Sequence, residues 1–295
     1  MARLNIAERR MPQDGKIRFK LGEMEIELRV VTLPTAGENE DVVLRILAGS
    51  GAQPLGKMNL SPDYLRSIQN LVASPYGMVL AVGPTGSGKT TTLHAMLGKV
   101  NAVEKKVWTV EDPVEITQPG LRQMQVNPQI GLSFASAMRS FLRADPDVIM
   151  VGEMRDEETA HMAVEASLTG HLVFSTLHTN NAPETVTRLI DMGMEPFSFS
   201  DALLAILAQR LARRLCDQCK EEYEASDSER SEFAGYLGET ALSRLAGTGP
   251  LKLFRAVGCV ECDNSGYRGR LPLHELLVNN DEIREAIQKK ATTAE

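Results

Sequence analysis

Apolar and polar residues alternate in the first part of the chain. From Lys16 to Arg45, apolar side chains recur at every second position in three runs, and turn-forming residues stand between the runs at Gly22 and at residues 34–37. Period-two alternation bounded by such residues predicts three half-buried antiparallel strands. Three strands alone leave an apolar face to be covered. We therefore expect either that the chain begins inside a domain or that this sheet leans on a later part of the chain.

A different pattern begins near Ser61. Residues 49–62 are rich in glycine, proline and polar residues, which indicates a linker. Strands are then predicted at 79–82, 106–110, 147–153 and 172–176, and helices from Ser61 and at 91–99, 134–143, 156–168, 181–192, 197–215 and 273–295. Strands that alternate with helices predict an α/β fold with a parallel, doubly wound sheet.

Two C-x-x-C pairs change the character of the sequence near its end. Cys216 with Cys219, and Cys259 with Cys262, enclose residues 220–258, which read as a helical excursion that returns to its starting point. Four cysteines in two tight pairs suit one tetrahedral structural Zn²⁺, with free thiols or a disulfide as the alternatives. We therefore divide the chain into four parts. These are a partial N-terminal β-rich domain at 1–50, a linker at 51–62, an α/β core at 63–215 and a C-terminal zinc-binding and helical region at 216–295.

The strand at 79–82 leads directly into a glycine-rich turn. Residues 83–90, G-P-T-G-S-G-K-T, fit the pattern G-x-x-x-x-G-K-[ST], and a helix follows. Glycines allow backbone N–H groups to surround a phosphate at the positive end of a helix. Lys89 would reach the β- and γ-phosphates and Thr90 would hold Mg²⁺; the alternative is an ordinary strand-to-helix turn. The predicted nucleotide-binding residues are Gly83, Pro84, Thr85, Gly86, Ser87, Gly88, Lys89, Thr90 and Thr91.

Acidic residues follow two of the predicted strands. Residues 111–115, E-D-P-V-E, follow the strand at 106–110, and Glu153 ends the strand at 147–153. Acids just past the carboxyl end of a strand lie in the rim where α/β sheets bind ligands. Either Glu153 or Glu115 could orient the water that attacks a phosphate, and Glu153 could instead hold Mg²⁺ through a water. The alternative for either residue is a solvated loop carboxylate.

Composition narrows the class of protein. The chain is 43% hydrophobic and 24% charged, as in a globular protein, and it has neither a long apolar run nor the apolar core of a signal peptide. We therefore expect a cytoplasmic protein. A net charge of −7 and an aromatic content of 5% do not favour nucleic-acid binding. Arg210, Arg213 and Arg214 form a local basic cluster, which suits a solvated face as well as a binding surface.

Several motifs, in order, resemble those of a known family. The phosphate loop is followed by T-V-E-D-P-V-E at 109–115, D-P-D-V-I-M-V-G-E-M-R-D at 145–156, G-H-L-V-F-S-T-L-H-T-N at 170–180 and Q-R-L-A-R-R-L-C at 209–216. Together they resemble the secretion ATPase superfamily, and more narrowly its type II secretion and type IV pilus assembly ATPases. The resemblance extends from about Ile6 to the C-terminal helix.

This resemblance implies roles for the motifs. It implies a RecA-like P-loop NTPase core that uses ATP and Mg²⁺, with Walker A at the phosphate loop, an aspartate box at 109–115 and Walker B at 145–156. His178, in the histidine box at 170–180, would sense the γ-phosphate. Arg29 and Arg45 lie in a region that the family uses to contact a neighbouring subunit's nucleotide; the alternative is two exposed strand arginines, and Arg18 is a third candidate.

The resemblance also implies a cellular role. The expected protein is a cytoplasmic homohexameric motor that hydrolyses ATP to ADP and phosphate to drive assembly of a pseudopilus or type IV pilus. It would reach the inner membrane through platform and docking proteins. The family's N-terminal domain has further strands upstream, so we expect this sequence to be a fragment without the segment that docks on a membrane partner. A nucleic-acid translocase or helicase and a regulatory scaffold with negligible turnover are the alternatives.

Overall fold

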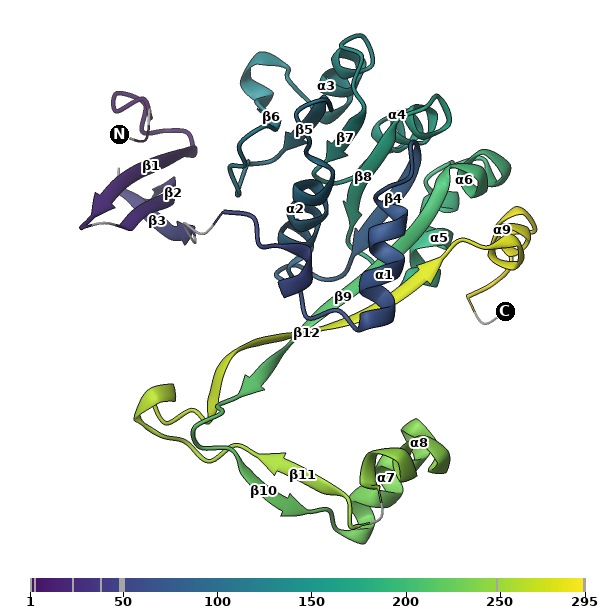
Figure 1. Cartoon of the computed structure of the whole chain (residues 1–295). Helices are drawn as coiled ribbons and strands as arrows, with labels where there is room; N and C mark the ends of the chain where they lie inside the picture. Colours follow the sequence, from purple (N-terminus) through teal and green to yellow (C-terminus); the bar gives the residue numbers. More distant parts are fainter. Residues whose placement is uncertain are drawn as a thin grey trace.

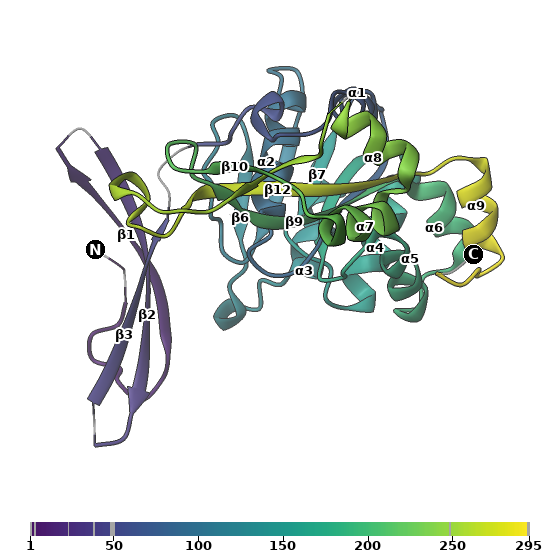
Figure 2. The same cartoon turned by 90° about the horizontal axis from the view of Figure 1, so that it is seen from below.

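The computed structural model describes residues 2, 4–22, 24–37, 39–47, 51–247 and 249–293. Within these ranges the strands form a three-stranded sheet, a seven-stranded sheet and a two-stranded sheet. Figure 1 shows the three-stranded sheet beside the large one, and the two-stranded sheet at the end of an arm that leaves the large sheet. Figure 2, turned by 90°, shows the three-stranded sheet again standing beside the core.

The N-terminal sheet confirms the three predicted strands. β1 (Gln13–Leu21), β2 (Met24–Thr35) and β3 (Asn39–Leu47) form an antiparallel meander. Arg29 on β2 pairs in register with Arg45 on β3, so the two arginines lie side by side. Alternate apolar residues of β3 stay exposed, because this small sheet does not bury its whole apolar surface in the described chain; these residues are Val42, Leu44 and Ile46.

The segment predicted as a linker is partly packed. Of residues 49–62, those from 51 onward are described, and 49–50 lie outside the described residues. A short 3-10 helix, η1 (Leu55–Lys57), carries Leu55, which is buried with Met58 in an apolar cluster that includes α2 (Lys89–Val100). Two apolar side chains therefore anchor this part of the predicted linker to the core.

The core follows the predicted alternation of strands and helices. Its other elements are α1 (Pro62–Leu71), β4 (Gly77–Val82), β5 (Val107–Glu111), β6 (Arg122–Gln125), η2 (Pro128–Ile130), α3 (Phe134–Phe141), β7 (Val148–Val151), α4 (Glu157–Leu168), β8 (Leu172–Leu177), α5 (Ala182–Asp191), α6 (Pro196–Ala202), β9 (Leu203–Leu215), β12 (Tyr267–Val278) and α9 (Asp281–Gln288). The strand order is β12-β9-β4-β8-β7-β5-β6. Six strands are parallel neighbours, and β12 runs antiparallel to β9.

Helices cover both faces of this sheet. Residues of α3, α4, α5, α6 and α9 belong to the apolar cluster on one face, and residues of η1, α1 and α2 to the cluster on the other. Strands β4, β7 and β8 are buried along their whole length. A parallel sheet covered on both faces needs such continuous apolar strands, whose carboxyl ends then meet at one edge.

Two helix predictions are wrong. The helix predicted at 197–215 ends at Ala202, and the rest is β9, which lies parallel to β4. Within the predicted helix at 273–295, the residues up to Val278 belong to β12, and the helix is α9. The run Leu203–Ala208 is apolar at almost every position, a pattern that a buried strand and a buried helix share. The sheet is therefore mixed rather than fully parallel.

The cysteine-bearing arm contains the predicted helical excursion. α7 (Asp227–Leu237) and α8 (Glu239–Ala246) lie between β10 (Glu221–Glu224) and β11 (Lys252–Arg255), which pair antiparallel. A 3-10 turn, η3 (Val260–Cys262), leads back into β12. Figure 1 shows how β9 and β12 together form the stalk of this arm.

Candidate nucleotide-binding site and metal centre

A cavity of about 590 Å³ lies at the carboxyl edge of the parallel sheet. Residues from the phosphate loop, the ends of three strands, the N-terminal sheet and β12 meet around it. Among the residues that line it are Arg45, Thr85, Gly86, Ser87, Gly88, Lys89, Thr90, Thr91, Glu111, Asp112, Glu115, Glu153, Arg155, Thr176, His178 and Arg270.

The backbone of the phosphate loop requires glycine. Gly83 and Gly88 have φ angles of 142° and 89°, which side chains other than glycine rarely adopt. A Cβ atom on Gly83 would also lie 2.2 Å from the backbone oxygen of Gln209. Gly88 is the N-cap of α2, so the loop leads directly to the positive end of that helix. This geometry is suited to an anion, as the sequence predicts.

Lys89 is held inside the loop. Its side chain is buried, and Nζ donates to the backbone oxygens of Gly83 at 2.7 Å and Pro84 at 3.1 Å. Burial lowers the pKa of Lys89, and the negative charge of Glu153 acts in the opposite direction. Lys89 Nζ also lies 3.4 Å from Nδ1 of His178. Backbone carbonyl oxygens of the loop thus hold the ammonium group, and it lies beside His178 in the wall of the cavity.

Glu153 and His178 are brought together with Lys89. Oε2 of Glu153 lies 3.4 Å from Nε2 of His178, and its other oxygen forms an ion pair with Arg155. A hydrogen bond to Glu153 is the main cause that raises the pKa of Arg155. Arg155 also lies 3.8 Å from Asp112. The Glu153 carboxylate, whose side chain is only 13% exposed, is therefore fixed in the wall of the cavity.

The two arginines predicted to act across a subunit boundary have different surroundings. Arg45 lines the cavity of its own chain. Arg29 instead pairs with Asp14, whose hydrogen bond is the main cause that raises the pKa of Arg29. Asp112 and Glu115 add smaller attractions. The third candidate, Arg18, donates to Thr117 Oγ1 at 3.3 Å. Arg45 is thus among the residues that line the cavity, whereas Arg29 and Arg18 are not.

The remaining predicted residues take several positions. Thr90, Thr91 and Glu115 line the cavity, and Glu115 is exposed there. Pro84 lines a smaller cavity that shares loop residues with the first. Gly83 contributes its carbonyl to Lys89. His171, at the start of β8, contacts the backbone oxygen of Ala166 and has a structural place away from the cavity.

Sequence reasoning missed Gln209 and Arg270. Gln209 Nε2 donates to the Ser87 oxygen at 2.6 Å, and its Oε1 accepts from Thr92 Oγ1 at 2.7 Å, so it ties the phosphate loop to β9. Arg270 reaches the cavity from β12. Both lie on strands that were read as helix or left unassigned, which hid their proximity to the loop.

The four cysteines converge at the far end of the stalk, between the β9–β12 pair and the β10–β11 pair. Their Sγ atoms all lie within 4.8 Å of one another, at 3.9 Å between Cys216 and Cys259, 3.8 Å between Cys219 and Cys262 and 3.7 Å between Cys259 and Cys262. Metal–sulfur bonds of about 2.3 Å in a tetrahedron separate the sulfurs by about 3.8 Å, whereas a disulfide needs about 2.05 Å. The arrangement fits a tetrahedral metal and not a disulfide.

The surroundings of Cys262 favour a thiolate. Burial acts to raise its pKa, but hydrogen bonds that its sulfur accepts from the N–H groups of Cys259 and Gly266 outweigh burial and lower it to about 6. Burial raises the pKa of Cys259 to about 11. A bound cation would remove the proton of such a thiol, since metals coordinate thiolates.

The chain was compared with known proteins. The family model for type II/IV secretion system proteins matches residues 1–295. Over 292 residues the chain is 48% identical to the type II secretion system ATPase E of Vibrio cholerae. The matched region covers 99% of this chain and 56% of that protein. It is 47% identical over 288 residues to the type IV pilus assembly ATPase PilB of Thermus thermophilus, over 97% of this chain and 31% of that protein. The chain thus spans about half, or less, of the length of these relatives.

Solved structures share the fold. The pilus retraction motor PilT with bound ADP superposes with a TM-score of 0.68 at 28% identity, over 95% of this chain and 67% of that one. The Legionella pneumophila ATPase DotB superposes with a TM-score of 0.64 at 24% identity, over 97% of this chain and 67% of that one. Among the described residues, no helix has the length and apolar character to cross a membrane. The chain belongs to the type II/IV secretion system protein family, which confirms the resemblance inferred from its motifs.

Proposed function

We propose that this chain is the catalytic part of a cytoplasmic, homohexameric ATPase that powers assembly of a type II secretion pseudopilus or type IV pilus. The observation that carries the proposal is the cavity that joins the phosphate loop, Lys89 and Glu153, in a chain 48% identical to a type II secretion ATPase. The core would be RecA-like. Inner-membrane platform and docking proteins would be its partners and would hold it at the membrane.

Different residues of the cavity would have different roles in phosphoryl transfer. The loop N–H groups and Lys89 would bind the phosphates, and the Thr90 hydroxyl would hold Mg²⁺, which when bound would neutralise charge on phosphate oxygens. Glu153, fixed by Arg155 and His178, or the exposed Glu115 orients the attacking water. His178 lies between Lys89 and Glu153, where it can respond to the γ-phosphate.

Arg45 supplies the positive charge that offsets the transferring phosphoryl group. We place its action in its own chain, because Arg45 reaches the same cavity as Lys89 and Glu153. The N-terminal sheet that carries Arg45 is connected to the core by residues 48–61, so closure of this sheet on the nucleotide would couple hydrolysis to movement. The sequence led us to expect an arginine donated by a neighbouring subunit, and the position of Arg45 supports the simpler arrangement.

Purified protein should hydrolyse ATP at a rate that single-stranded DNA does not change. The chain carries a net charge of −7 and little aromatic surface, whereas strand-tracking proteins use a basic, aromatic groove. Phosphate release is measured with and without an excess of DNA, at several protein concentrations. Turnover that rises with protein concentration and ignores DNA supports a ring-forming secretion motor. Strong stimulation by DNA would favour a nucleic-acid translocase instead.

Protein purified without chelator should contain about one Zn²⁺ per chain, because the four sulfurs already have tetrahedral spacing. Cys262→Ser should lower the zinc content and destabilise the arm, with ATP binding at the distant phosphate loop retained. Metal analysis, thermal unfolding and nucleotide binding are measured side by side. Ser231→Ala, at an exposed position of α7 in the same arm, is the matched control. Four titratable thiols and no metal in the wild-type protein would contradict this prediction.

A further inference from the structure

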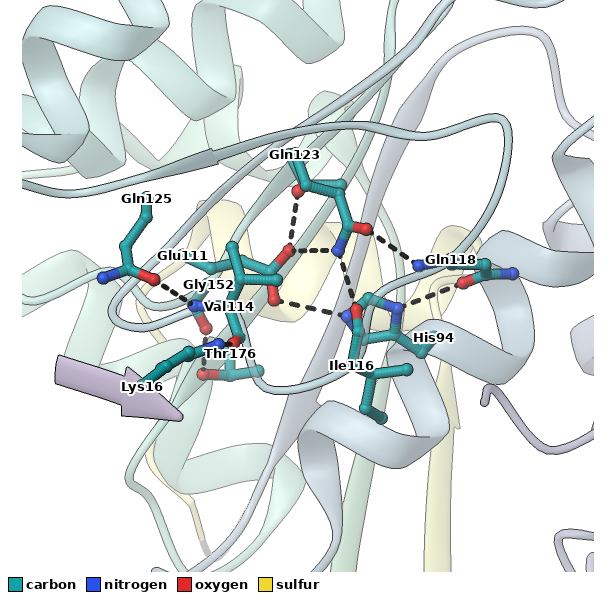
Figure 3. A network of polar contacts seen from close by, with 11 residues as sticks. Lys16, His94, Glu111, Val114, Ile116, Gln118, Gln123, Gln125, Gly152 and Thr176 are labelled. Atoms are coloured by element: carbon teal, nitrogen blue, oxygen red, sulfur yellow. Dashed lines mark hydrogen bonds and ion pairs between the residues drawn. The ribbon is translucent and has the colours of Figure 1, made fainter. Parts of the chain in front are cut away.

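A buried contact links the phosphate helix, α2, to the aspartate box at 109–115. His94 lies on α2 one turn after Thr90, and none of its side chain is exposed. Its Nε2 is 3.3 Å from Oε2 of Glu111, the last residue of β5 (Figure 3). Only 2% of Glu111 is exposed. Carboxylates buried to this degree need partners, because their desolvation is costly. Glu111 is therefore held by the helix whose first turn would bind phosphate.

Glu111 is committed to this contact rather than free for catalysis. Its second oxygen, Oε1, accepts from Thr109 Oγ1 at 2.6 Å and from Gln123 Nε2 at 3.1 Å. Both carboxylate oxygens thus have partners inside the protein. Glu111 differs in this way from Glu115, which is exposed in the cavity four residues later.

The same network closes the loop that follows Glu111. His94 Nδ1 lies 3.1 Å from Gln118 Oε1, and the Gln118 N–H donates to Gln123 Oε1 at 2.8 Å. Gln123 Nε2 also donates to the backbone oxygen of Ile116 at 2.8 Å. Residues 112–118 are therefore fastened at both ends to His94 (Figure 3).

The outer side of this loop touches the N-terminal sheet. Lys16 on β1 donates to the backbone oxygen of Val114, and Arg18 donates to Thr117 Oγ1 at 3.3 Å. The loop thus lies between the sheet that carries Arg45 and the helix that begins with Lys89. Three of its members, Asp112, Pro113 and Glu115, line the cavity.

We propose that His94 and Glu111 are positioning residues, which lock the loop at 112–118 to the phosphate helix so that Glu115 and Asp112 keep their places in the cavity. This inference rests on the proposed ATPase function. It predicts a specific defect: loss of the link displaces the acids and leaves the phosphate loop, and hence nucleotide binding, in place. A misplacement of about 1 Å can cost on the order of 10²-fold in rate.

The test compares three histidine variants. His94→Leu, which removes both contacts, should lower kcat by about tenfold or more and change the KM for ATP by less than about threefold. His94→Gln retains an N–H donor toward Glu111 and should recover much of kcat. His161→Leu, at an exposed histidine on α4, is the matched control and should resemble wild type. Amide hydrogen exchange at 112–118 should be faster in His94→Leu alone.

Other outcomes decide the proposal as clearly. Unchanged kcat and exchange in His94→Leu, or a glutamine variant as impaired as the leucine variant, would overturn it. If His94→Leu does not fold, Gln118→Ala tests the same link through the other ring nitrogen, and wild-type kcat and loop exchange in that variant would also reject it. A wild-type protein without ATP turnover would refute the proposed function, whereas hydrogen exchange would still report whether His94 holds the loop.

Discussion

ATP turnover should fall by about 10²–10³-fold in Lys89→Ala, because the variant lacks the one ammonium group held inside the phosphate loop. Nucleotide affinity should fall as well, since this charge contacts the phosphates in the ground state and in the transition state. Burial lowers the pKa of Lys89, so its charged form is held at a cost and its removal should not unfold the protein. Phosphate release, nucleotide binding and thermal unfolding are measured together.

Lys99→Ala is the matched control for that experiment. Lys99 lies on the same helix, is exposed and does not line the cavity, so its loss should leave turnover within about twofold of wild type. Turnover close to wild type in Lys89→Ala would show that the cavity is not the nucleotide site. Loss of secondary structure in Lys89→Ala would mean that the loop depends on the lysine for folding. Nucleotide binding by the folded fraction would then decide whether the cavity is the nucleotide site.

Loss of the Arg45 guanidinium should cost about 10³-fold in kcat, the magnitude typical of an arginine that stabilises a transferring phosphoryl group. ATP binding should persist in Arg45→Ala, because Lys89 and the loop remain. Arg29→Ala should have a smaller effect, since Arg29 pairs with Asp14 and does not line the cavity.

Mixing Arg45→Ala with Lys89→Ala separates the two possible sources of the arginine. If Arg45 acts in its own chain, every chain of a mixed ring lacks one necessary group, and turnover stays at the sum of the two separate variants. Recovery of turnover under conditions where subunits exchange would mean that a neighbour supplies Arg45, as the sequence led us to expect. Wild-type protein mixed with Lys89→Ala provides the control for subunit exchange.

Local spacing made the phosphate loop, the strands around it and the cysteine pairs predictable. In each case the residues that act together are close in sequence, so one pattern specifies both the backbone and the chemistry. β9 and β12 escaped prediction because the apolar run at 203–208 has no helical or strand period, and β12 acquires its partner only through a pairing distant in sequence. With these strands misread, Gln209 and Arg270 could not be placed beside the loop.

The network around His94 lay outside sequence reasoning for a different reason. A histidine on an apolar helix and a glutamate at a strand end each have ordinary explanations, and only the packing of α2 on β5 brings them within 3.3 Å. Glu111, inside a recognised motif, was treated as one more rim acid, whereas its burial separates it from Glu115. Burial of a polar group depends on tertiary contacts that the pattern of a single segment does not contain.

The cysteine cluster lies where β9 and β12 separate, and this position bears on strand register. Leu215 pairs with Tyr267, and Cys216 directly follows Leu215. Cys262 precedes β12, and its Sγ accepts a hydrogen bond from the N–H of Gly266, the residue before Tyr267. A slip of β12 by one residue would turn each of its side chains to the opposite face and would remove Arg270 from the wall of the cavity. A metal that bridged the four sulfurs would oppose such a slip, because it would hold the ends of β9 and β12 at one fixed offset. A metal far from the phosphates would thereby determine which side chains of β12 face the nucleotide.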